Sequence, residues 1–171
     1  MIKMIFATTL GGHFGLSDGS LPWKHMKGDM QHFFSYTKGC ILIMGRGTWD
    51  SLPEPKLPGR VCIVVSSIQQ ENVHTVKDLT SALLLARSLS VATNICIIGG
   101  RRLLLEGASH ADEVSISHIS TQCLKTSNWN TETYFLDTQE ILEVLGERGI
   151  TDFTQLLMTD ELNIFKLTRG I

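Results

Sequence analysis

The sequence lacks the residue spacings that bind metals or build a disulfide framework. Its 171 residues include four cysteines, and no two of them form a Cys-x-x-Cys pair. Its six histidines include no His-Glu-x-x-His motif, so we expect no metal site. Three of the cysteines lie in apolar runs, where a thiol behaves as a small hydrophobic group. We interpret all four as reduced and structural: Cys40, Cys62, Cys96 and Cys123.

The sequence also lacks an excess of charge of one sign and any long hydrophobic run. It has 15 basic and 17 acidic residues, and the basic ones are too scattered to neutralise the phosphates of a nucleic acid. The apolar run over residues 1–10 is too short for a secretory signal, and no other run approaches the length of a membrane span. We therefore expect a cytoplasmic protein with a small, weakly charged partner, and neither a nucleic acid nor a membrane.

No internal repeat, low-complexity tract or proline-rich linker divides the chain. Its length suits one domain, and its hydrophobic share of 43% with 19% charged residues is typical of a soluble globular protein. We expect a single domain over residues 1–171 and a monomer as the simplest assembly.

Short apolar runs alternate with helical patterns through the first two thirds of the chain. Asp78 is a plausible N-cap for a helix with one apolar face, formed by Leu79, Ala82, Leu83, Ala86 and Leu89, and Asp29 and Phe33 lie in another short helix. This alternation predicts an α/β fold with a mixed, mostly parallel β-sheet flanked by helices. The apolar runs, which predict strands buried on both faces, cover residues 2–7, 40–44, 61–65 and 95–98.

The C-terminal third has a different pattern. Residues 114–119 alternate apolar and polar side chains, and residues 153–158 and 162–167 are strand-like runs on either side of a turn, which predicts an antiparallel C-terminal hairpin. Residues 120–133, which include Asn128 and Asn130, are predicted to form a long loop, and residues 138–146 a short surface helix.

Two glycine turns follow predicted strands. Neither the cluster over residues 11–15 nor the one over residues 45–50 has the spacing of a dinucleotide fingerprint. Gly45 and the pair Gly99-Gly100 nevertheless each follow a strand and begin a helical turn, and two helix N-termini can hold two phosphates. For each glycine turn taken alone, the alternative is a tight turn beside solvated arginines. The combination of two turns with arginines at neighbouring strand ends favours phosphate binding. The candidate phosphate donors are Arg46, Arg102, Ser66 and Ser67.

Six short motifs occur in order along the chain: Leu21-Pro22-Trp23, Asp29 with Phe33-Phe34, residues 43–49, Leu57-Pro58-Gly59-Arg60, Ser66-Ser67 and residues 97–100. Their order and spacing resemble those of the dihydrofolate reductase family, particularly its phage and bacterial branch. The resemblance spans nearly the whole chain and continues into residues 111–114 and 133–135. It implies reduction of dihydrofolate to tetrahydrofolate with NADPH.

The resemblance assigns three residues to catalysis. Asp29 would bind N3 and the exocyclic amine of the pterin, and a lone carboxyl in an apolar cleft has a raised pKa that suits proton delivery to N5. Trp23 would hold the connecting water, and Leu21 would lie in the mobile loop that closes over nicotinamide. Simple core packing is the alternative for most pocket residues. The implied substrate-binding residues are Ile5, Phe6, Ala7, Asp29, Met30, Phe33, Ser51, Leu52, Leu57, Arg60, Ile98 and Ser117.

The resemblance also implies an NADPH site at the two glycine turns, with a cis Gly99-Gly100 peptide. Charged contacts to the 2′-phosphate would favour NADPH over NADH by about a hundredfold or more. The implied cofactor-binding residues are Ala7, Gly15, Gly45, Arg46, Gly47, Thr48, Val65, Ser66, Ser67, Ile98, Gly99, Gly100, Arg101, Arg102, Leu103, Leu104 and Glu132.

Four features depart from the family pattern. Leu104 stands where many members have an aromatic residue, Arg101 replaces a frequent third glycine, and Gly47 replaces a common basic residue. The loop over residues 15–22 is one residue longer. A reductase of the riboflavin pathway and an NADPH-holding structural protein are the alternative functions. The Leu-Pro-Trp motif followed by Asp29 and Phe33 argues against the first, and the presence of the proton-donor candidate Asp29 argues against the second.

Overall fold

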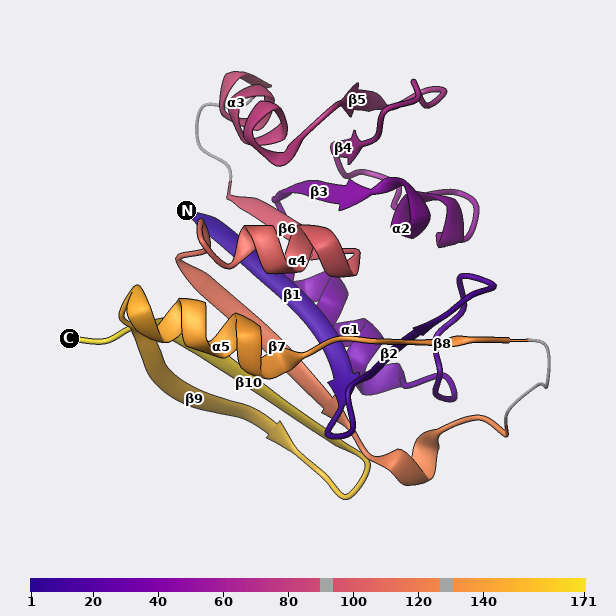
Figure 1. Cartoon of the computed structure of the whole chain (residues 1–171), viewed down its shortest axis with the longest axis vertical. Coiled ribbons are helices and arrows are strands. Elements are labelled where there is room, and N and C mark those ends of the chain that lie inside the picture. Colours follow the sequence, from indigo (N-terminus) through magenta and orange to yellow (C-terminus); the bar gives the residue numbers. More distant parts are fainter. Residues whose placement is uncertain (90–93, 127–130) are drawn as a thin grey trace.

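The computed structural model describes residues 1–89, 94–126 and 131–171. Its centre is an eight-stranded sheet in the order β5-β4-β3-β6-β1-β7-β10-β9 (Figure 1). These strands are β1 (Ile2–Thr9), β3 (Ile41–Gly45), β4 (Cys62–Val65), β5 (His74–Val76), β6 (Ile95–Gly99), β7 (Glu113–Ile119), β9 (Ile150–Met158) and β10 (Leu162–Arg169). A separate two-stranded sheet pairs β2 (His13–Leu16) with β8 (Thr133–Phe135).

The pairing directions confirm the predicted fold class. All strand pairs from β5 to β7 are parallel, whereas β10 runs antiparallel to both β7 and β9. The predicted C-terminal hairpin is therefore present, with its turn after β9, at one edge of a mostly parallel sheet. The described helices are α1 (Lys27–Tyr36), α2 (Arg46–Ser51), α3 (Leu79–Leu89), α4 (Arg101–Gly107), α5 (Thr138–Glu147) and the short 3-10 turn η1 (Thr121–Cys123).

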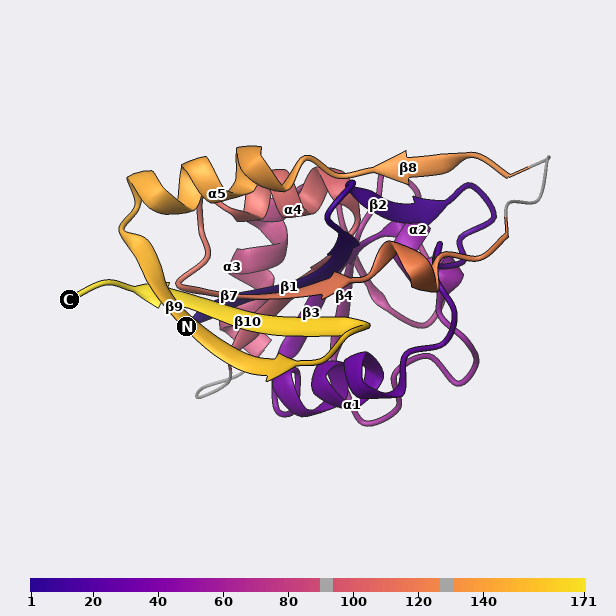
Figure 2. The ribbon, with the colours of Figure 1, turned by 90° about the horizontal axis from the view of Figure 1, so that it is seen from below.

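Helices cover both faces of the sheet (Figure 2). One core cluster joins α3, α4 and α5 to residues such as Met4 and Ile43, and a second cluster lies on the α1 face and includes Ile5 and Leu42. Neighbouring residues of one strand therefore enter different clusters, because successive side chains of a strand point to opposite faces. This burial on both faces explains why the strands read as unbroken apolar runs.

Several details differ from the sequence predictions. Three strands of three or four residues, β2, β5 and β8, were not predicted, because such short segments carry little periodicity. Leu89 was expected on the buried face of α3, but it is 42% exposed at the end of that helix. The predicted surface helix is α5, and it is not purely a surface element, because Ile141 and Leu145 are fully buried.

The predicted loop over residues 120–133 contains η1 and ends at β8, and Asn128 and Asn130 lie outside the described residues. All four cysteines are buried and free, as predicted. Across the residues that the structure describes, no helix combines the length and the apolar composition needed to cross a membrane.

Candidate functional site

The two glycine turns lie side by side at the carboxyl ends of neighbouring strands. β3 pairs with β6, and Gly45 and Gly100 are the N-cap residues of α2 and α4. A Cβ placed on Gly45 would lie 3.5 Å from the backbone nitrogen of Gly100. The Gly99-Gly100 peptide is cis, as the family resemblance implied. Both helices therefore begin at one place on the sheet, which is where open α/β sheets bind ligands.

The N-termini of these two helices differ from those of α3 and α5. Asp78 accepts a hydrogen bond from the backbone of Ser81 at 2.7 Å, and Asp137 accepts one from Gln139 at 2.9 Å, so side chains cap α3 and α5. Among the described residues, no side chain caps α2 or α4. Their first backbone N–H groups are available to an anion, and the helix dipole favours negative charge there.

Two arginines stand in the first turns of these helices. Arg46 is paired with Asp50 at 3.4 Å and Arg102 with Glu106 at 2.9 Å, each four residues along its own helix. Both arginines are exposed, so these pairs are weak and the guanidinium groups remain accessible to a competing phosphate. On β4 and after it, Val65 and Ser66 are partly buried and Ser67 is exposed.

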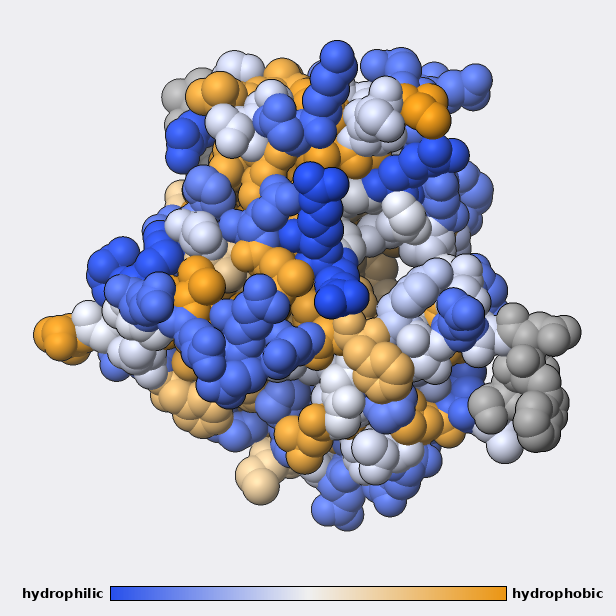
Figure 3. Space-filling view, viewed as in Figure 1, coloured by the Kyte–Doolittle hydropathy of each residue, from blue (hydrophilic) through white to orange (hydrophobic). Residues whose placement is uncertain are grey.

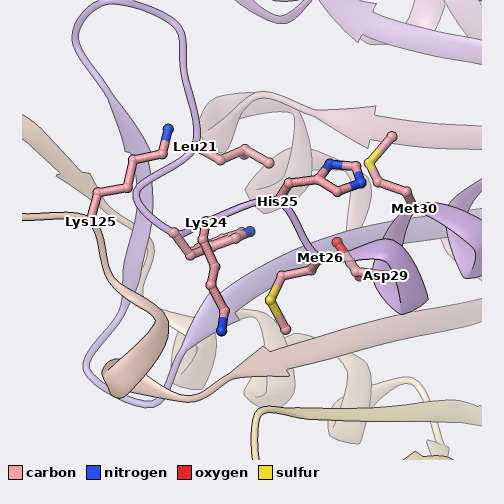
Figure 4. A pocket seen from close by; sticks show the side chains of 8 residues that line it. Leu21, Lys24, His25, Met26, Asp29, Met30 and Lys125 are labelled. Carbon is pink, nitrogen blue, oxygen red and sulfur yellow. The ribbon is translucent and has the colours of Figure 1, made fainter.

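The acid lies in the first turn of α1, on the opposite face of the sheet from α4. Asp29 is partly buried, and burial raises the pKa of its carboxyl, while a hydrogen bond with Ser117 and the nearby His32 oppose that change. A cavity of about 220 Å³ opens beside it. In Figure 4 the carboxyl group points from α1 toward the space between His25 and Met26. The cavity residues are Leu21, Trp23, Lys24, His25, Met26, Asp29, Met30 and Lys125.

The loop that carries Leu21 rests against the chain near β8. In the same loop, the backbone N–H of Ser17 donates a hydrogen bond to the Glu132 carbonyl at 2.8 Å, and the Ser17 hydroxyl accepts one from the backbone N–H of Glu132 at 3.0 Å. Leu21 is 46% exposed, whereas Trp23 is 2% exposed and packs in a third core cluster beside Ala7. Trp23 is thus fixed, and Leu21 projects at the mouth of the cavity. Gly15 lies on β2 and is partly buried.

One strand separates Ser117, which acts on the acid, from the strand that ends in the glycine pair. β1 pairs with β6, which ends at Gly99, on one side and with β7 on the other, where Ala7 is level with Ser117. Strands β6 and β7 are therefore two strand spacings, or about 10 Å, apart. Figure 3 shows a recess in the surface beside α4, between α2 and the loop that follows β2.

Four candidate residues form the far end of this face. Leu57 is 8% exposed, and Phe33 and Leu52 pack partly buried against its cluster. Arg60 donates to the Phe34 carbonyl at 2.8 Å and to the Thr37 hydroxyl at 3.3 Å, so its guanidinium is held at the end of α1. An arginine held in this way is ordered for a carboxylate.

The other candidates fall into three groups. Phe6, Leu103 and Leu104 are buried in the cluster under α3, α4 and α5, so the Phe6 side chain points away from the acid and only its backbone is available there. Ile5, Met30 and Ile98 lie near the α1 face. Gly47, Ser51 and Arg101 are exposed and Thr48 is partly buried. The Thr48 hydroxyl lies 3.3 Å from the position of a Cβ on Gly99 and so contacts the second turn.

Sequence reasoning missed the basic and sulfur side chains around the acid. Lys24, His25 and Met26 lie between two recognised motifs, and Lys125 comes from a segment almost a hundred residues away, for which no sequence signal existed. It also missed His32, which lies one helical turn after Asp29. Helical spacing from the acid was a usable signal for that residue.

Comparisons with known proteins agree with this geometry. A family model described as dihydrofolate reductase matches residues 1–142. The dihydrofolate reductase type A10 of Escherichia coli is 37% identical over 124 residues, which are 69% of this chain and 65% of that protein. The dihydrofolate reductase type 3 of Salmonella typhimurium is 34% identical over 140 residues, which are 80% of this chain and 79% of that protein.

A solved structure has the same fold at lower sequence identity. The dihydrofolate reductase from Enterococcus faecalis, complexed with NADP(H) and RAB-propyl, has a TM-score of 0.69 at 20% identity and covers 100% of this chain and 97% of its own. The likeness includes the C-terminal hairpin, which lies beyond the part that the family model matches.

Proposed function

The chain belongs to the dihydrofolate reductase family, and on that basis we propose that it transfers a hydride from NADPH to C6 of dihydrofolate, with protonation at N5, to give tetrahydrofolate. The product serves one-carbon metabolism and thymidylate synthesis, and the site is an antifolate target. We further propose that residues 1–171 form one reductase domain that acts as a cytoplasmic monomer.

The residues at the two glycine turns fit an NADPH molecule. Two helix N-termini without side-chain caps meet where Gly45 and Gly100 leave no side chain in the way, which suits a pyrophosphate. Arg46, Ser66 and Ser67, with Arg102 nearby, supply donors for the 2′-phosphate. When bound there, NADPH supplies the hydride. The chain itself binds the phosphates, orients the nicotinamide end near Gly99 and excludes water through the loop that carries Leu21.

Asp29 carries the proposal. A carboxyl whose pKa is raised by burial holds a proton closer to neutral pH than an exposed one does, which suits a group that directs a proton to N5 of the pterin. Ser117 holds this carboxyl, and its strand β7 is separated from β6 and Gly99 only by β1. The strand that carries Ser117 therefore lies about two strand spacings from the strand that ends at Gly99. In this proposal, Leu57 would contact the benzoyl group of the substrate and Arg60 would bind its glutamate carboxylate, as the family resemblance implies.

The test is to mix the protein with NADPH and dihydrofolate and follow the absorbance of the reduced nicotinamide. We expect loss of absorbance that requires both compounds and is much slower with NADH. Tight NADPH binding without turnover on dihydrofolate would contradict the proposal and favour a structural role instead.

A further inference from the structure

Three polar side chains of α1, spaced at i, i+3 and i+7, lie along a row of polar side chains on β7. Of the three, His32 has a hydrogen bond to Ser115, Ser117 acts on the pKa of Asp29, and Glu113 acts on the pKa of Tyr36. The Tyr36 hydroxyl itself has no hydrogen-bond partner among the described residues. The two rows have similar lengths, because seven helical residues advance about 10 Å and four strand residues about 13 Å. The acid of the proposed site is therefore the first member of a polar ladder between a helix and a strand.

His32 occupies the middle of this ladder. Its Nε2 atom lies 2.7 Å from the hydroxyl oxygen of Ser115, which is fully buried. Its ring packs against the Tyr36 ring with centroids 5.5 Å apart. The imidazole is thus fixed on two sides, one helical turn from the Asp29 carboxyl and on the same side of the helix.

We propose that His32 is a positioning residue for the acid: held by Ser115 one helical turn from Asp29 on the same side of α1, its cationic form favours the ionised form of the Asp29 carboxyl, so that the two groups titrate as a coupled pair. The inference rests on the proposed reductase function for its catalytic meaning. The coupling itself is a property of the chain and does not require turnover.

The charges around His32 favour this partnership. On α1, Asp29 raises the pKa of His32, while burial, the largest effect, lowers it. From β1, Lys3 also lowers it. Lys3 has its own anionic partner, because its Nζ atom lies 4.0 Å from Glu113 of β7, and Lys166 of β10 lies 3.5 Å from the same carboxylate.

The buried cations beside the ladder are therefore already paired. Lys3 also donates to the Tyr36 carbonyl at 2.9 Å and lies 3.8 Å from the centre of its ring. Burial and the Glu113 carboxylate raise the pKa of Tyr36, so this phenol stays neutral and donates no charge to its neighbours. The charged groups that act on His32 are Asp29 and Lys3. Because Lys3 is paired with Glu113, Asp29 is the group whose charge His32 can balance.

The sign of the coupling follows from electrostatics. A cationic His32 lowers the pKa of Asp29, and an ionised Asp29 raises the pKa of His32, by the same free energy in each direction. A nearby opposite charge shifts a pKa by about one unit or more, and the partial exposure of His32 reduces that, so we expect shifts of about half to one pH unit.

The first test follows the histidine rings by NMR as a function of pH, in the whole protein without ligands. In Asp29→Asn we expect the midpoint of His32 to fall by about half to one pH unit. His118 is the matched control, because it lies on the same strand, is partly buried against Phe165 with centroids 4.9 Å apart, and owes its lowered pKa to burial alone. Its midpoint should not move.

The second test measures the pH dependence of dihydrofolate reduction in His32→Gln, which keeps a polar group near Ser115 but cannot be charged. Because the cation is removed, the pKa of Asp29 rises, and we expect the falling limb of the rate profile to move up by about half to one pH unit with NADPH binding unchanged. Ser115→Ala, which releases the ring, should move the limb in the same direction by less. Thermal unfolding of both variants checks that they fold.

The outcomes separate the inference from the proposed function. An unchanged His32 midpoint in Asp29→Asn, or a profile of His32→Gln that superimposes on the wild type, would overturn the inference while leaving the reductase intact. A coupled His32 midpoint in a protein that fails to turn over dihydrofolate would contradict the proposed function and leave the coupled pair standing.

Discussion

Thr48 and Gly99 bring the two glycine turns into contact: the Thr48 hydroxyl lies 3.3 Å from the position that a Cβ on Gly99 would occupy. Gly99 also has a φ of +130°, a conformation that other residues rarely adopt. The contact links the first turn of α2 to the end of β6. The space between the turns therefore depends on the absence of a side chain at residue 99.

A methyl group at this position should damage both stability and cofactor binding. For Gly99→Ala we expect a free energy of unfolding lower by about 1–3 kcal/mol, because the backbone is strained and Thr48 must move. NADPH affinity, measured by calorimetry or fluorescence, should fall by tenfold or more. Gly146→Ala is the control: nothing lies within 4 Å of its Cβ position in α5, so it should stabilise the protein by about 0.5–1 kcal/mol and leave binding alone. Equal effects of the two variants would contradict the assignment of the turn.

Arg46 should set the preference for NADPH over NADH. Arg46→Ala removes a charged donor from the proposed 2′-phosphate site, so the ratio of kcat/KM for the two cofactors should fall by about ten- to a hundredfold, mainly through weaker use of NADPH. Arg87→Ala changes an equally exposed arginine in the last turn of α3 and should leave the ratio as it is. A ratio that stays at the wild-type value in Arg46→Ala would place the 2′-phosphate elsewhere.

The Glu113 carboxylate should be important for stability. It neutralises two lysines, Lys3 and Lys166, and its side chain and that of Lys3 are only 13% and 12% exposed. Glu113→Gln leaves a buried cation unpaired, so we expect the free energy of unfolding to fall by about 3 kcal/mol in urea titrations. Glu161→Gln removes the partner of Lys24 in a half-exposed pair and should cause little change. A small effect at both sites would show that Lys3 is hydrated after all.

The contribution of Asp29 to the free energy of unfolding should fall as the pH rises, whereas the contribution of an acid with a lowered pKa increases with pH. The folded-state pKa of Asp29 is raised above the ordinary value of 3.8, so its contribution is fully present below that value and is lost as the pH rises through the raised one. Asp29→Asn should therefore be more stable than the wild type at pH 7.5, and the difference should shrink at pH 4.

Asp78 supplies the control of opposite sign. Hydrogen bonds from Ser81 lower its pKa, so its contribution is present at neutral pH and is lost in acid. Asp78→Asn should be less stable than the wild type at pH 7.5, with the difference vanishing as the pH falls through the range of the lowered pKa. Urea unfolding at the two pH values measures both variants. If Asp29→Asn were also less stable than the wild type at pH 7.5, with a difference that vanished in acid, the Asp29 carboxyl would be solvated and its pKa would not be raised by burial.

The strands and helices that bury a continuous or periodic apolar face could be predicted from the sequence. The apolar runs at β1, β3, β4 and β6 each gave a strand within a few residues, because burial on both faces leaves no room for polar side chains. Asp78 caps α3 as its position before the apolar helix face predicted. By contrast, β2 and β8 pair only with each other across more than a hundred residues, and neither has a pattern of its own.

Some residues of the candidate site could likewise be predicted from the sequence, and others could not. The glycine turns and Asp29 could be named from motifs, and the structure brings the two turns together across β3 and β6. The basic residues near the acid could not, because Lys125 reaches the cavity from a distant irregular segment. The pairing of His32 with Ser115 needs the register of α1 against β7, which neither segment reveals alone.

The most direct test of the account compares the rate of dihydrofolate reduction by the wild type and by Asp29→Asn at pH 7.5, with NADPH binding measured in parallel. If Asp29 directs the proton to the pterin, the rate should fall by about two to four orders of magnitude while the affinity for NADPH stays within a few-fold. A variant that keeps the wild-type rate would contradict the role of this carboxyl, and with it the claim that the cavity beside α1 is where the pterin is reduced.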